Sequence, residues 1–179
     1  MASNLLLTSS PAGRPRRRGS PVRVLLACRQ RLMRGALHRM LDAAENVELV
    51  GDVDDLDSVR RDLGSSCPDV LALDRGLLAG ATIATIHELR ERWPAVQLVI
   101  LTSDDNAAFA ERTVSAGALG FVLKQFADSE LPAALHAVAG GEEYVSPRIA
   151  ARLDALRRTR SASGVRAPGA EAQPERLRG

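Results

Sequence analysis

The sequence predicts an α/β fold in which a doubly wound, parallel sheet of five strands is covered by helices on both faces. Strand-like runs alternate with segments of helical spacing, and the connections between them are short. Three of the runs are almost entirely apolar, as strands buried on both faces are. The five strand-like runs span residues 22–27, 46–52, 69–74, 96–102 and 120–124.

The segments between these runs carry apolar residues at the spacing of an amphipathic helix. In the first of them the apolar positions are Leu32, Met33, Ala36, Leu37, Met40 and Leu41. The stretch 146–158 begins with Ser before Pro and places Ile149, Leu153 and Leu156 on one face. Because Pro is favoured in the first turn of a helix, this stretch predicts an additional C-terminal helix leading out of the domain.

These patterns divide the chain into four parts. Residues 1–21 show neither helical nor strand periodicity and are predicted to form a disordered basic arm. A globular domain is expected over 22–141, followed by a linker helix over 142–158. The Gly-, Pro- and Ser-containing segment 159–179 is predicted to be a disordered tail.

The charge distribution argues against nucleic-acid binding by the globular domain. The formal net charge is +2, but the arm 1–21 has four Arg and no acids, and residues 157–179 have six Arg and two acids. Residues 22–156 are therefore left with a formal charge of −6. Because contacts with phosphates require clustered Lys or Arg, DNA binding by this chain is expected only through the basic ends.

Lysine and cysteine usage points to candidate site residues and a compartment. Lys124 is the only lysine, whereas 23 residues are Arg. Because Lys carries a compact charge that Arg does not replace, Lys124 is a candidate site residue; the alternative is that it lies on a solvated surface by chance. Cys28 and Cys67 form no disulfide framework and have no metal-ligand spacing, which favours the cytoplasm. No apolar run approaches the roughly 20 residues of a membrane span, so no membrane association is expected.

The residues at the ends of the predicted strands are the main functional candidates, since open α/β sheets bind ligands at the carboxyl ends of their strands. These residues are Cys28, Arg29, Asp52, Asp74, Thr102, Ser103 and Lys124. Asp74 could equally be a helix-capping or loop acid, and Thr102 could equally cap the helix that begins near Asp104. No glycine-rich phosphate loop follows a strand, which disfavours a nucleotide-binding enzyme, and the chain is not expected to be an enzyme.

Asp74 after "PDVLAL", Thr102 after "VQLVIL" and Lys124 in "AGALGFVLK" together resemble the receiver domain of two-component response regulators, of the CheY-like superfamily. The resemblance covers about residues 22–140, and "GGEEYVSPRIAARL" is similar to the region that follows receivers of NarL/FixJ-type transcription regulators. It implies the strand order 2-1-3-4-5.

The resemblance also implies roles for individual residues. Asp74 matches the phosphoacceptor, Thr102 the residue that hydrogen-bonds the phosphoryl group, and Lys124 the lysine that pairs with it. Phe121 matches the aromatic residue whose rotation reports activation. These types suit an acyl phosphate, because its negative charge needs a cation and a hydroxyl donor.

The sequence departs from the receiver pattern at the end of the first strand. The acidic pair that helps the acceptor aspartate to hold Mg²⁺ is replaced by Cys28 and Arg29. A thiol and a guanidinium supply no oxygen ligand, so Mg²⁺ binding is predicted to be lost or weak and no cofactor is expected. We further hypothesise a salt bridge between Arg29 and Asp74 that stands in for the metal, with a solvent-facing Arg29 as the alternative.

The function expected from these features is a stand-alone atypical receiver, a pseudo-receiver. It would signal through a protein partner or homodimer bound by the surface over residues 104–139, with another regulator or a histidine kinase as partner classes. One alternative is a transcription-regulator receiver acting with a DNA-binding partner, since the 21 residues after Arg158 cannot form a helix-turn-helix domain. Others are a small-ligand sensor, or an ordinary receiver that rebuilds its metal site with Asp52 or Asp104.

Overall fold

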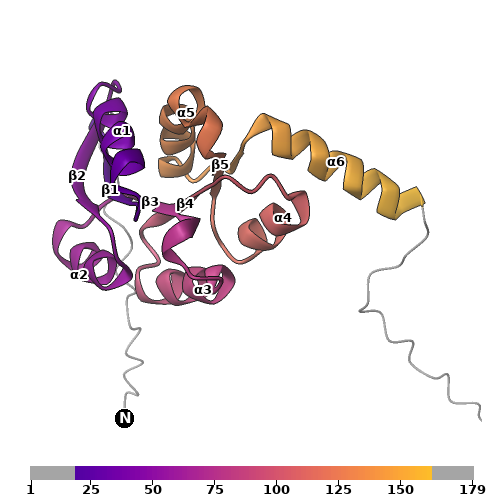
Figure 1. The fold of residues 1–179 in the computed structure, drawn as a ribbon, viewed down its shortest axis with the longest axis horizontal. Coiled ribbons are helices and arrows are strands. Elements are labelled where there is room, and N and C mark those ends of the chain that lie inside the picture. The colour runs from indigo at the N-terminus through magenta and orange to yellow at the C-terminus, as the bar shows by residue number, and fades with distance from the viewer. Residues whose placement is uncertain (1–18, 163–179) are drawn as a thin grey trace, which may run out of the picture.

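The computed structural model describes residues 19–162 and confirms the predicted α/β fold (Figure 1). Every strand pairing in the sheet is parallel, and the strand order is β2-β1-β3-β4-β5-β6. The five expected strands keep the order implied by the receiver resemblance, and a sixth of two residues joins the edge beside β5. The strands are β1 (Val22–Ala27), β2 (Val47–Val53), β3 (Val70–Asp74), β4 (Gln97–Thr102), β5 (Gly120–Leu123) and β6 (Tyr144–Val145).

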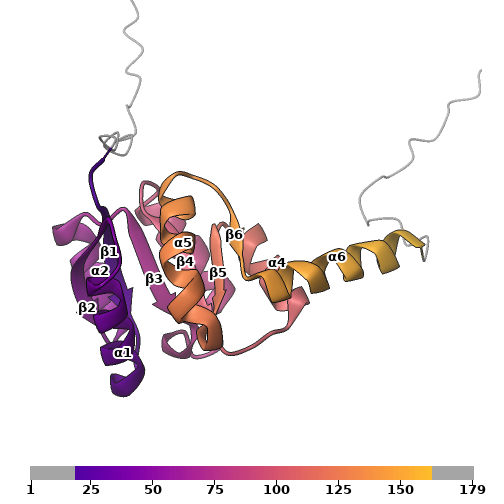
Figure 2. The same cartoon turned by 90° about the horizontal axis from the view of Figure 1, so that it is seen from above.

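Helices cover both faces of the sheet, and the side-chain alternation along each strand explains how (Figures 1 and 2). In β3, Val70 and Ala72 pack toward one face, whereas Leu71 and Leu73 pack toward the other. The first face is covered by α1 (Arg31–Asp42) and α5 (Ala127–Ala139). The second face is covered by α2 (Leu56–Ser66), α3 (Thr82–Arg92) and α4 (Ala107–Ser115).

The C-terminal helix α6 (Pro147–Ala162) differs from the expected linker helix in its bounds and its packing. The residues before it turn into β6, so the helix starts later than 142, and it continues into residues expected to belong to the tail. Its first half packs against α4, where Ile149 and Leu153 join the core. Its second half extends away from the domain (Figures 1 and 2).

Two short 3-10 helices connect the sheet to the candidate site. Helix η1 (Arg75–Leu77) follows β3 directly, and η2 (Lys124–Phe126) follows β5 directly. Most of the predicted arm and tail lie outside the described residues. Among residues 19–162, no helix is long and apolar enough to cross a membrane.

Candidate functional site

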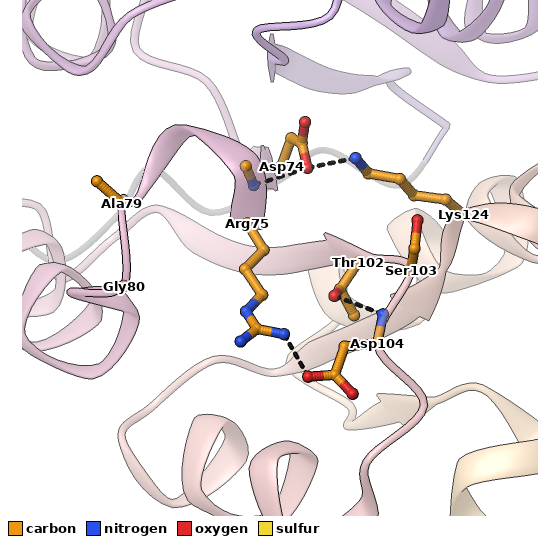
Figure 3. Close-up of a pocket in the computed structure, with 9 residues that line it drawn as sticks. Asp74, Arg75, Ala79, Gly80, Thr102, Ser103, Asp104 and Lys124 are labelled. Carbon is orange, nitrogen blue, oxygen red and sulfur yellow. Dashed lines mark hydrogen bonds and ion pairs between the residues drawn. The ribbon is translucent and has the colours of Figure 1, made fainter.

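Asp74 is the last residue of β3 and lies at the carboxyl edge of the sheet, where parallel strands place their end residues together. Its side chain is only 1% exposed. A carboxylate at this depth requires partners, because burying an isolated charge is costly. It also lines a pocket of about 430 Å³ with Thr102, Asp104 and Lys124 (Figure 3).

Three groups engage the two carboxylate oxygens of Asp74. Lys124 Nζ lies 2.6 Å from Oδ1, and the backbone N–H of Gly76 donates to the same oxygen at 3.0 Å. The thiol of Cys28 donates to Oδ2, with Sγ 3.4 Å away. Asp74 also acts as the N-cap of η1 through the Gly76 contact. The two roles considered for Asp74, pocket residue and helix cap, are therefore both observed.

Lys124 reaches Asp74 because β5 ends one residue before it and η2 turns the backbone at the pocket edge. Its side chain is 11% exposed, so the ion pair is shielded from water on both sides. Charges in such an environment interact more strongly than on the surface but have also lost hydration. The lone lysine of the chain is therefore a pocket residue, as predicted.

Cys28 follows β1 and is fully buried beside Asp74. Burial and the neighbouring negative charge of Asp74 raise the pKa of this thiol above its ordinary value. The thiol therefore stays protonated near neutral pH and donates a hydrogen bond to the carboxylate. At the position where receivers carry an acid, this chain holds a neutral hydrogen-bond donor.

The hypothesised salt bridge between Arg29 and Asp74 is wrong. Arg29 is exposed, and no ion pair among residues 19–162 joins it to Asp74. The strand register gives the reason: Ala27 lies beside Leu73, so the next residue, Cys28, is the one that comes level with Asp74. Arg29 lies one residue further along, in a bend after β1, and the cation that pairs with Asp74 is Lys124.

Thr102 lies at the end of β4 in the same pocket, as expected, and is 2% exposed. Its hydroxyl oxygen accepts a hydrogen bond from the backbone N–H of Asp104 at 3.0 Å. This contact stabilises the turn that leads from β4 to α4, but Thr102 does not cap α4, whose N-cap is Asn106. The Thr102 hydroxyl and the Asp74 carboxylate share the pocket from neighbouring strands (Figure 3).

Arg75 is a pocket residue that the sequence interpretation missed. It forms an ion pair with Asp104, and its guanidinium carbon lies 4.0 Å from the ring centroid of Phe109 in α4. Phe109 in turn packs edge-on against Phe121, with ring centroids 6.0 Å apart. Phe121, the expected switch aromatic, is fully buried. The available signal was the position of Arg75 directly after Asp74.

The residues at this edge do not fit a magnesium ion. Mg²⁺ prefers oxygen ligands in octahedral geometry, whereas Asp74 is surrounded by an ammonium, a backbone N–H and a protonated thiol. Asp52, considered above as a substitute ligand, accepts instead from His38 Nδ1 at 2.7 Å. Asp104 pairs with Arg75. Within residues 19–162 no cluster of three or more His, Cys, Asp or Glu is placed to hold a metal.

The sequence matches the family model of the response regulator receiver domain over residues 24–136. The chain belongs to this family. The resemblance drawn from Asp74, Thr102 and Lys124 is thereby confirmed at the level of the receiver domain.

This receiver domain is related to NarL/LuxR-type regulators. It is 29% identical over 135 residues to the response regulator GacA of Pseudomonas aeruginosa, covering 74% of this chain and 62% of GacA. It is 28% identical over 134 residues to the oxygen regulatory protein NreC of Staphylococcus epidermidis, covering 74% of this chain and 61% of NreC. The chain thus spans less than two thirds of the length of these relatives.

Solved structures agree with the fold. A two-component response regulator of the LuxR family from Aurantimonas sp. superimposes with a TM-score of 0.72 at 26% identity, covering 78% of this chain and 99% of that one. The RcsB response regulator of Salmonella typhimurium superimposes with a TM-score of 0.69 at 23% identity, covering 75% of this chain and 68% of RcsB. The second likeness concerns the fold alone.

Proposed function

We propose that this receiver domain is a pseudo-receiver, which signals through protein contacts without Mg²⁺-dependent phosphorylation of Asp74. The observation that carries the proposal is the set of partners around Asp74. An ammonium, a backbone N–H and a thiol already engage both carboxylate oxygens. Phosphoryl transfer relies on divalent metal to neutralise the developing charge, and the Cys28 thiol occupies the place of a metal-binding acid.

The partner surface of this proposal is the one expected from the sequence, residues 104–139, with one change. Helix α6 packs against α4 and covers part of this surface. Ala108 of α4 and Ala133 of α5 remain exposed, whereas Ala107 and Ala134 belong to the core. Small exposed side chains allow close approach of a partner helix, and a second copy of this chain is the partner we favour. Dimers are described for RcsB, which has the same fold.

Two measurements test the two halves of the proposal. Incubation of the full chain with acetyl phosphate and Mg²⁺, followed by intact-mass analysis, is expected to give no phosphoryl adduct. An adduct that disappears in Asp74→Asn would contradict the phosphorylation-independent half.

Sedimentation velocity over a range of concentrations is expected to show a dimer that Ala108→Arg or Ala133→Arg weakens.

The matched control for the dimer measurement is Ala36→Arg, which adds the same charge at an exposed position of α1. We expect this variant to associate like the unmodified chain. A monomer at every concentration, or equal weakening by all three substitutions, would contradict the assigned surface. Sedimentation velocity of this chain mixed with a histidine kinase or with another regulator then distinguishes the remaining partner classes.

A second candidate function is action on transcription together with a DNA-binding partner. It is favoured by the names of the relatives, which include the transcriptional regulatory protein DegU of Brevibacillus brevis, and by the description of RcsB in complex with DNA. Direct DNA binding by this chain would be salt-sensitive and carried by the basic ends. Comparison of the full chain with a variant that lacks 1–18 and 163–179 tests this in a mobility-shift assay.

A further inference from the structure

The loop between β4 and α4, residues 103–106, contains two adjacent acids that contact different parts of the molecule. Asp104 faces the pocket and pairs with Arg75, the residue directly after Asp74 (Figure 3). Its backbone N–H binds the Thr102 hydroxyl, and its Oδ1 accepts from the N–H of Asn106 at 3.0 Å. The position of Asp104 therefore fixes the course of the whole loop.

Asp105, the next residue, contacts α6. Its Oδ2 lies 2.6 Å from Arg152 Nη1 and 3.7 Å from Arg148 Nε. Arg152 Nη1 also donates to the backbone carbonyl of Asp105 at 2.9 Å, so one guanidinium binds both the side chain and the main chain of the loop. Arg148 and Arg152 are one turn apart on the same face of α6.

Apolar contacts accompany these ion pairs on both sides of the loop. On the pocket side, Arg75 lies over the Phe109 ring, which belongs to the first turn of α4. On the α6 side, Ile149 is fully buried and Leu153 is 6% exposed, and both pack into the core that contains Ala107 and Ala110 of α4. The loop and the start of α4 thus connect Arg75 to α6 within a few residues.

We propose that this loop is a clasp that holds α6 on α4 and releases it when Arg75 leaves Asp104. The acidic side chains of both ion pairs are more than a third exposed, so each pair alone is weak and readily reversible. An anion that enters the pocket competes with Asp104 for Arg75, and loss of that contact frees the loop that presents Asp105. The clasp goes beyond the proposed function, because it does not depend on whether Asp74 is phosphorylated.

Hydrogen–deuterium exchange of the full chain tests the clasp directly. Asp104→Asn removes the charge that binds Arg75, and within residues 19–162 the hydrogen bonds and ion pair of Asp104 are to Arg75, Thr102 and Asn106 and not to α6. We expect the amides of residues 150–159 in α6 to exchange several-fold faster in this variant, and Arg75→Gln to give the same result from the other partner. Unchanged exchange in β3 and β4 serves as the internal check that the domain remains folded.

The matched control is Asp54→Asn, which removes an exposed carboxylate paired with Arg34 at 2.9 Å, at the opposite edge of the sheet. It is expected to leave α6 exchange unchanged. In an Arg148→Ala/Arg152→Ala background α6 is already released, so Asp104→Asn should add no further increase. Unchanged α6 exchange in both Asp104→Asn and Arg75→Gln, or a full additional increase in the double-Ala background, overturns the proposal.

Discussion

The only lysine of the chain, Lys124, lies with its Nζ 2.6 Å from Oδ1 of Asp74, and both side chains are largely withdrawn from solvent. This pair joins the end of β3 to the start of η2 across the intervening strand β4. The negative charge of Asp74 is thus neutralised by a lysine of the same domain.

Removal of the Lys124 ammonium is expected to destabilise the domain strongly. Lys124→Met leaves the buried carboxylate of Asp74 without its cation, which costs about 3 kcal/mol of the free energy of unfolding in such pairs. Denaturant unfolding measures the difference, with Arg39→Met on the exposed side of α1 as the control. The double variant Asp74→Asn/Lys124→Met should recover most of the loss, and a double variant as unstable as Lys124→Met would contradict this origin.

Restoring the acidic pair is expected to create a metal site. In Cys28→Asp/Arg29→Asp, the carboxylate at position 28 lies beside Asp74 and the exposed position 29 changes from a positive to a negative charge, so the domain should lose stability without metal through like-charge repulsion. Mg²⁺ should then raise the free energy of unfolding, by about 1.4 kcal/mol at roughly ten times its Kd. Thermal unfolding with and without Mg²⁺ checks this, and Asp74→Asn in the same background should abolish the gain. An equal Mg²⁺ effect on the unmodified chain would refute the argument from ligand types.

Gly120 is expected to tolerate no side chain. A Cβ at this position would lie 2.6 Å from Cγ2 of Val99 on the neighbouring strand. Gly120→Ala should therefore cost about 1–3 kcal/mol of stability through overpacking, and Val99→Ala should relieve part of it. Gly64→Ala is the matched control, since Gly64 lies in α2 with open space around it and should gain up to about 1 kcal/mol from helix propensity. A Gly120→Ala variant with unchanged stability would contradict this expectation and show that β4 and β5 move apart here at little cost in free energy.

The ion pair between α2 and α3 is expected to give a pH-dependent contribution to stability. Arg60 contacts Glu88 through Nε at 2.8 Å and Nη2 at 2.9 Å, and this guanidinium holds the pKa of the Glu88 carboxyl below its ordinary value of 4.5. Because the folded pKa is the lower one, the stabilisation is complete above pH 4.5 and is lost as the pH falls through the folded value.

Glu88→Gln tests this contribution. Since both side chains are about one third exposed, solvent screening limits the loss at pH 7 to about 0.5–1 kcal/mol. The difference from the unmodified chain should shrink as unfolding is measured at successively lower pH. Glu91→Gln, an exposed position of the same helix, provides the control. A difference that stays constant down to pH 3 would contradict the assigned ion pair.

Much of the fold was predictable from sequence because β1, β3, β4 and β5 are almost entirely buried and therefore stand out as apolar runs. The limits of β1 agree with the prediction, β2 is shifted by one residue, and β3, β4 and β5 are each one residue shorter at one end. The two-residue strand β6 was not predictable, since its pairing with β5 depends on tertiary contacts. The end of α6 was also misjudged, because Thr159 to Ala162 carry no helix-stop signal of Gly or Pro.

Membership of the pocket was predictable for Asp74, Thr102 and Lys124, because parallel strands bring their carboxyl ends to one edge. The sequence did not predict which cation pairs with Asp74, because the pairing depends on the direction in which each side chain points. Arg29 lies in a bend after the end of β1, and the sequence pattern does not specify this bend. The Arg75–Asp104 contact depends on the turn of η1, which the sequence pattern does not specify.

The most direct test of the pseudo-receiver proposal is the thermal unfolding midpoint of the full chain with and without Mg²⁺ plus beryllofluoride, a phosphoryl mimic. A ligand that binds only the folded state must raise the midpoint. We predict no shift, because the groups around Asp74 supply no site for the metal. A rise in the midpoint that Asp74→Asn abolishes would contradict this account and show a working phosphoacceptor pocket.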